Sequence, residues 1–109
     1  MFGPNGEVVP TSSETTNERE AYFGQYQFIT GVIPNVIQEI LDKSSSDPVI
    51  ILQSDHGPRW SGDWNNVLNA YHLPGNGNSL VYDDISPVNS FRIVFDKYLG
   101  ANYPLIEDR

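Results

Sequence analysis

The residues with the clearest chemical potential in this 109-residue sequence are adjacent: Asp55 and His56, within Ser54-Asp55-His56-Gly57. A carboxylate oxygen and an imidazole nitrogen are both suitable ligands for Zn²⁺ or Mn²⁺. The motif directly follows the apolar run at residues 49–52, and open α/β sheets bind ligands at the carboxyl ends of their strands. The pattern therefore indicates a metal site, although a turn with a capping aspartate and a solvated histidine would look the same locally.

Several other side chains are weaker candidates for a site. Arg59 follows the motif and is our candidate substrate-binding residue, because a guanidinium matches phosphate oxygens well, but it could instead pair with an acid of the chain. Trp60 and Trp64 could line a substrate opening or cap the core. His72 lies in an apolar run, which favours a core or edge histidine. Residues 83–84 are both aspartates; neighbours on a strand point apart, which favours a solvated turn over a metal pair.

A long helix over residues 17–43 is expected before the motif, because apolar residues recur there at spacings of three and four. These residues are Tyr22, Tyr26, Ile29, Ile33, Ile37, Ile40 and Leu41. Pro34 falls inside the pattern and lacks a backbone N–H group. We therefore expect a kink near residues 31–34 or two helices in tandem.

Two strands are expected on either side of the loop that holds the motif. The β-branched run that begins at Val49 predicts a fully buried strand of a parallel sheet over residues 49–54. A second strand is expected at about residues 67–73. A parallel crossover needs a strand at each end, and the strand that would precede the long helix is not in this chain. The sequence therefore predicts an α/β fold that is one part of a larger domain.

A C-terminal helix is predicted over residues 87–99, with Ser86 as its N-cap, Pro87 in its first turn and Gly100 just after its end. Its expected apolar face consists of Val88, Phe91, Val94 or Phe95, and Tyr98. Residues 1–16 contain the turn sequence Pro4-Asn5-Gly6 and are expected to form an irregular arm. Residues 17–109 are expected to form a single partial domain.

Composition excludes several classes of protein. Fourteen acids against six bases give a net charge of −8, so a nucleic-acid backbone would be repelled. Without cysteine, the chain has no disulfide or thiolate metal site. No run of eighteen apolar residues is present, so we expect no membrane span in this chain, and we expect the fragment itself to be soluble.

The stretch DPVIILQSDHGPR, residues 47–59, resembles the C-terminal metal-binding segment of the alkaline phosphatase superfamily. It is most similar to the sulfatase-like branch, which includes lipoteichoic acid synthases and related membrane-anchored enzymes. The order of segments is also similar over about residues 20–108: a Tyr-rich helix, then VIILQSDHG, LNAYHLPG and ISPVNSFRIVFDKYLG.

The resemblance implies that Asp55 and His56 are metal ligands in a C-terminal fragment of a larger sulfatase-like α/β domain. The metal would be Zn or Mn, with Mg or Ca as alternatives, and would act in the complete parent domain on a phosphate or sulfate ester. In the family, a Thr or Ser nucleophile and an acidic ligand precede the region matched here, and no position of this sequence corresponds to either. We therefore expect no catalytic residue in this chain, no turnover by the chain alone, and little or no bound metal.

The resemblance also implies a parent protein that faces the outside of the cytoplasmic membrane. Loss of the neighbouring strands would leave an open sheet edge, so we expect the fragment to self-associate through it. The alternative is a non-enzymatic small binding module that retains part of the fold and binds a partner through its acidic surface and aromatic loop.

Overall fold

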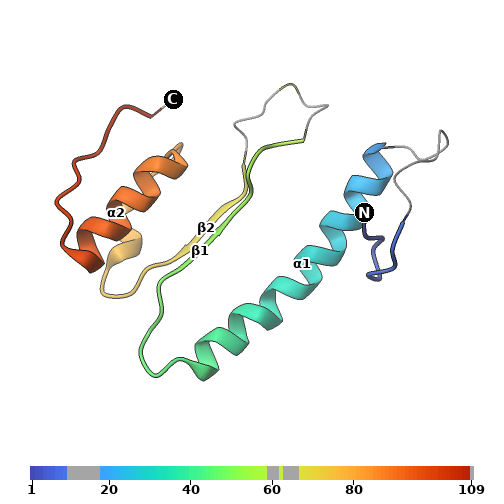
Figure 1. Ribbon diagram of the computed structural model, residues 1–109, viewed down its shortest axis with the longest axis horizontal. Coiled ribbons are helices and arrows are strands. Elements are labelled where there is room, and N and C mark those ends of the chain that lie inside the picture. Colours follow the sequence, from blue (N-terminus) through green and yellow to red (C-terminus); the bar gives the residue numbers. More distant parts are fainter. Residues whose placement is uncertain (10–17, 59–61, 63–66, 109) are drawn as a thin grey trace. The chain divides into compact units, whose positions relative to one another are not determined.

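The computed structural model describes residues 1–9, 18–58, 62 and 67–108 (Figure 1). Their elements follow the order α1 (Glu18–Lys43), β1 (Ile50–Gln53), β2 (Asn69–His72), the 3₁₀ helix η2 (Gly77–Leu80) and α2 (Pro87–Leu99). The chain divides into two compact units, Met1–Ser45 and Ser46–Arg109. The mixed α/β content confirms the coarse fold class predicted from the sequence.

In the first unit, residues 1–9 form a short turn whose two ends lie side by side. The Gly6 N–H donates to the Gly3 carbonyl at 3.0 Å, and Phe2 forms an isolated bridge with Val8. Gly6 has a φ of 83°, a left-handed conformation that glycine adopts readily. The ring of Phe2 lies 5.6 Å from the ring of Phe28, so the turn packs against the first half of α1.

Helix α1 passes through Pro34 as one helix, so the expectation of two helices in tandem is wrong. Residue 17, the predicted start, lies outside the described residues. None of the described apolar side chains of α1 is buried within the first unit. Those with high exposure are Phe23, Tyr26, Ile29, Val32, Val36 and Ile40. Local hydrogen bonds therefore contribute more to this helix than a packed core does.

In the second unit, β1 pairs with β2 in the antiparallel sense, with Ile50 opposite His72 and Gln53 opposite Asn69. All four residues of β1 are half-buried. The expectation that β1 is a fully buried strand of a parallel sheet is thus wrong for this chain. The physical reason is that β1 has β2 as its one partner in the described structure, and β2 runs back beside it.

The core of the second unit is small. Leu73, Ile85 and Ile93 are its buried apolar residues among those described. Helix α2 begins and ends where the sequence predicts: the Ser86 hydroxyl accepts from the Asn89 N–H, and Gly100 ends the helix with a φ of 64°. Its apolar face is only partly the predicted one: Val94 and Tyr98 are half-buried, but Val88, Phe91 and Phe95 are exposed. The buried residues of α2 are Asn89, Ser90 and Ile93.

Within the described ranges, no helix is both long and apolar enough to cross a membrane.

Candidate functional site

The Ser54-Asp55-His56-Gly57 motif begins where β1 ends, and hydrogen bonds join its first residue to the segment before β2. The Ser54 N–H donates to the Leu68 carbonyl at 3.0 Å, and the Leu68 N–H donates to the Ser54 hydroxyl at 2.9 Å. One residue earlier, the Gln53 amide donates to the Asn69 side-chain oxygen at 2.7 Å. These contacts fix the backbone immediately before Asp55, so the end of β1 sets the position of the motif.

Asp55 and His56 present their side chains to each other. One carboxylate oxygen of Asp55 accepts from the His56 backbone N–H at 3.0 Å. The second oxygen lies 3.6 Å from Nε2 of His56. The Asp55 side chain is 88% exposed and that of His56 39% exposed, so both are accessible. The predicted carboxylate and imidazole therefore converge on one side of the motif.

The other ring nitrogen of His56 identifies the tautomer. Nδ1 lies 2.7 Å from the Gly57 carbonyl oxygen. A carbonyl only accepts, so Nδ1 donates its proton, and in the neutral ring the lone pair is on Nε2. Metal-binding histidines are commonly oriented in this way by a backbone carbonyl. His56 thus directs its lone-pair nitrogen to the side on which the Asp55 carboxylate lies.

The spacing of these two atoms fits a shared cation. Two ligands on a tetrahedral zinc ion, at bonds of 2.0–2.1 Å, are about 3.3 Å apart, close to the observed 3.6 Å. In the part of the chain that the structure describes, no group of three or more His, Asp or Glu residues could hold a metal ion. The pair therefore supplies at most part of a coordination sphere, because zinc sites use three or four protein ligands.

The other predicted candidates lie apart from this pair or outside the described structure. Arg59, Trp60 and Trp64 are outside the described residues, so their roles stay predictions. His72 lies on β2, is partly exposed, and its Nε2 is 2.6 Å from an Asp47 carboxylate oxygen. Residues 83–84 form an exposed turn, as predicted.

A buried polar network in the second unit was not predicted. The Asn89 side chain is 0% exposed. Its Nδ2 donates to the Ile106 carbonyl at 2.7 Å and to an Asp108 carboxylate oxygen at 2.8 Å, and its Oδ1 accepts from the Ile106 N–H at 3.0 Å. The signal that was available is the spacing from Asn89 to Ile93, since residues four apart share a helix face.

Asp108 completes this network at the N-terminus of α2. Its carboxylate accepts from the Ser86 N–H at 2.8 Å and from the Tyr82 hydroxyl. Hydrogen bonding by Ser86 and by the Tyr82 hydroxyl lowers the pKa of Asp108 to about 2. The same contact with Asp108 raises the pKa of Tyr82 above its ordinary value, because the protonated phenol is the hydrogen-bond donor. The network holds Asp108 ionised and Tyr82 protonated.

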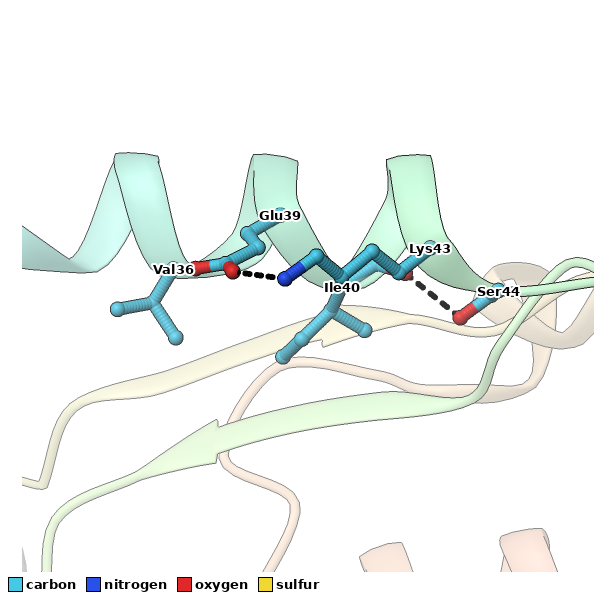
Figure 2. Close-up of a pocket in the computed structure, with 5 residues that line it drawn as sticks. All are labelled: Val36, Glu39, Ile40, Lys43 and Ser44. Carbon is cyan, nitrogen blue, oxygen red and sulfur yellow. Dashed lines mark hydrogen bonds and ion pairs between the residues drawn. The ribbon is translucent and has the colours of Figure 1, made fainter.

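A hollow of 360 Å³ lies at the C-terminal end of α1, lined by Val36, Glu39, Ile40, Lys43 and Ser44. Figure 2 shows the Lys43 and Glu39 side chains reaching toward each other, where they form an ion pair. The Ser44 hydroxyl donates to the Ile40 carbonyl at 2.6 Å. The charged groups that line the hollow are thus paired with each other, and its hydroxyl is bound to the backbone, so this hollow is a weaker candidate than the Asp55–His56 pair.

Comparison with protein-family models, with curated proteins and with solved structures gives no match to this chain.

Proposed function

We propose that this chain is the C-terminal portion of a sulfatase-like domain of the alkaline phosphatase superfamily. In the complete domain, Asp55 and His56 hold part of a divalent metal site, with Zn²⁺ or Mn²⁺ as the best match to the donor types. The parent enzyme would hydrolyse or transfer a phosphate or sulfate ester. One observation supports the proposal most strongly: the carboxylate oxygen and Nε2 lie 3.6 Å apart, directly after β1.

Each local residue has a definable part in such a site. The bound cation would lower the pKa of a nucleophilic hydroxyl and stabilise charge on an ester oxygen. Asp55 supplies a negative oxygen that offsets part of the cation charge, and His56 supplies a neutral nitrogen. The Gly57 carbonyl holds the His56 ring in the required tautomer. The hydrogen bonds between Ser54 and Leu68 fix the backbone that precedes Asp55.

The metal-ligand positions are tested by adding Mn²⁺ to the full 109-residue chain and recording paramagnetic broadening by NMR. We expect broadening at low millimolar Mn²⁺ to be strongest around residues 55–57. Asp55→Asn and His56→Asn should each remove this preference. Asp83→Asn is the matched control, because it neutralises an exposed acid elsewhere and should leave the preference in place. Broadening that is unchanged in both motif variants would contradict the assignment of the pair.

The expected inactivity of the isolated chain is tested by phosphodiesterase and sulfatase assays with Mn²⁺ or Zn²⁺ supplied. We expect no turnover above the metal-only blank, because two protein ligands are too few to hold the cation tightly. Turnover that disappears in Asp55→Ala would show instead that the chain is an enzyme by itself.

The relation to a parent enzyme is tested by sequencing upstream of the codon for Met1 and by mass spectrometry of the protein in its source. A continuous reading frame that encodes a Thr or Ser nucleophile and membrane-spanning helices would support the proposal. A protein whose mature form begins at Met1 would instead favour the small binding module.

A further inference from the structure

We infer that residues 103–108 form a strap that α2 holds by a polar clamp centred on Asn89, and that this strap opens as a unit while α2 stays folded. The strap is the extended segment that follows α2 and belongs to neither a helix nor a strand. It is a conformational device that is independent of the motif at residues 54–57.

Apolar burial holds the strap only in part: the Tyr103 ring lies 6.4 Å from the Phe95 ring, but no apolar residue of the strap is buried. Every residue from 102 to 107 is exposed, and the apolar side chains of Tyr103, Leu105 and Ile106 are 51%, 50% and 47% exposed. The hydrophobic effect scales with the apolar area removed from water. Specific polar contacts must therefore supply the rest of the attachment.

Asn89 provides the central contact. Its carboxamide binds Ile106 at both backbone groups, donating to the carbonyl at 2.7 Å and accepting from the N–H at 3.0 Å. This is the two-point pairing that a neighbouring β-strand would make. The Asn89 side chain is fully buried; its amide also donates to the Tyr82 hydroxyl at 3.2 Å, but the partner of its oxygen, the Ile106 N–H, comes from the strap.

Asp108 and Arg92 add further contacts on the two sides of Ile106. The Asp108 carboxylate binds the Asn89 amide and the Ser86 N–H, both at 2.8 Å. Arg92 donates from Nη1 to the Pro104 carbonyl at 2.9 Å, and its guanidinium lies 5.8 Å from the centre of the Tyr103 ring. The clamp is thus a row of three polar side chains along α2 and the chain end.

The connection to α2 suits a hinge. Gly100 and Asn102 have φ values of 64° and 53°, both left-handed. The Gly100 N–H donates to the Asp96 carbonyl and the Ala101 N–H to the Phe95 carbonyl, both at 3.1 Å, which completes the hydrogen bonding at the end of α2. Rotation at Asn102, beyond Ala101, therefore breaks no hydrogen bond of the helix or its cap. When the strap opens, water can hydrogen-bond the released groups. The free-energy cost of opening is therefore the difference between the hydrogen bonds within the protein and those made to water.

The test is amide hydrogen exchange of the full chain, measured by NMR for wild type, Asn89→Ala and Asp108→Asn. In wild type, the Ile106 amide should exchange more slowly than in a free peptide but faster than the Ile93 amide within α2. Asp108→Asn should raise exchange at Ile106 by about tenfold, the effect expected from weakening one charged hydrogen bond, with little change at Ile93. Asn89→Ala removes both side-chain hydrogen bonds to Ile106, so it should raise exchange there by more.

Two further comparisons keep the test decisive. Glu107→Gln is the matched control, because Glu107 is an exposed carboxylate one residue away, and it should leave exchange at Ile106 unchanged. Asp108→Asn retains side-chain shape, so it reports on the clamp even if Asn89→Ala unfolds the unit. Equal loss of protection at Ile93 and Ile106 in Asp108→Asn, or no loss at Ile106, would overturn the inference.

Discussion

At the scale of single residues, the Asp108 carboxylate links the end of the chain to the start of a helix. It accepts the Ser86 N–H, which lies at the N-cap of α2. The N–H groups of the first helical turn lack partners within the helix, and a negative charge is favoured there by the helix dipole. Hydrogen bonding by Ser86 and Tyr82 therefore stabilises the ionised form, which is why the pKa of Asp108 falls from 3.8 to about 2.

This shift predicts acid sensitivity of the strap. A carboxyl with a lowered pKa in the folded state stabilises that state above its unfolded pKa of 3.8, and the stabilisation is lost as pH falls toward about 2. We expect the exchange protection of the Ile106 amide, corrected for intrinsic rates, to fall between about pH 4 and pH 2. In Asp108→Asn this decrease should be absent, whereas Glu107→Gln should retain it. Parallel decreases in wild type and Asp108→Asn would contradict the role of this carboxyl.

At the scale of elements, local signals set the bounds of the helices well. The Ser86-Pro87 start and the Gly100 end of α2 each act through the backbone of a few neighbouring residues, so their effect is readable from sequence. Helix α1 continues through Pro34 because one proline removes a single donor, and the rest of the 26-residue helix keeps its own hydrogen bonds.

Other features depend on residues far apart in the chain and were not predictable. The buried face of α2 includes Asn89 because its partners, Ile106 and Asp108, are 17 and 19 residues away. A hydrophobicity pattern places apolar residues inside, so it selected Val88 and Phe91, which are exposed. At the candidate site, the motif indicated Asp55 and His56 as a pair, but their convergence depends on the hydrogen bond from Nδ1 to the Gly57 carbonyl.

The packing of η2 against α2 gives a prediction at this scale. A Cβ atom on Gly77 would meet the Tyr98 hydroxyl and would lie 2.6 Å from the Cβ of Leu73. Gly77→Ala should therefore displace Tyr98 from its 2.6 Å hydrogen bond to the Pro74 carbonyl. We expect a loss of about 1–3 kcal/mol in the free energy of unfolding of the second unit, as for other overpacked sites.

The measurement is denaturant unfolding followed by tyrosine fluorescence and by exchange of the α2 amides. Gly31→Ala is the control, because Gly31 lies within α1 with no atom near its missing Cβ. Alanine there should stabilise the helix by up to about 1 kcal/mol. If Gly77→Ala left unfolding of the second unit unchanged, the close contact with Tyr98 would not be a constraint on the fold.

At the scale of the whole molecule, apolar exposure and net charge act in opposite directions. In the described residues, three apolar side chains are buried, whereas α1 alone exposes Phe23, Ile29, Val32, Val36 and Ile40 along with other apolar residues. The outer edges of the two-stranded sheet also lack strand partners in the described structure. Exposed apolar surface and open edges promote association. The net charge of −8 opposes it, since like-charged copies repel each other.

This balance predicts self-association that strengthens with salt. Added salt screens the repulsion between copies but leaves the apolar contribution in place. The sedimentation coefficient should therefore rise with protein concentration, and more steeply at about 0.5 M than at about 0.05 M NaCl. Ile40→Glu should shift the protein toward monomer, because it places a charge on the apolar side of α1. Asn35→Glu adds the same charge at an exposed polar position of the helix and should have a much smaller effect. A strict monomer at every concentration and salt would show that repulsion outweighs the exposed apolar surface, and equal effects of the two variants would show that net charge alone governs association.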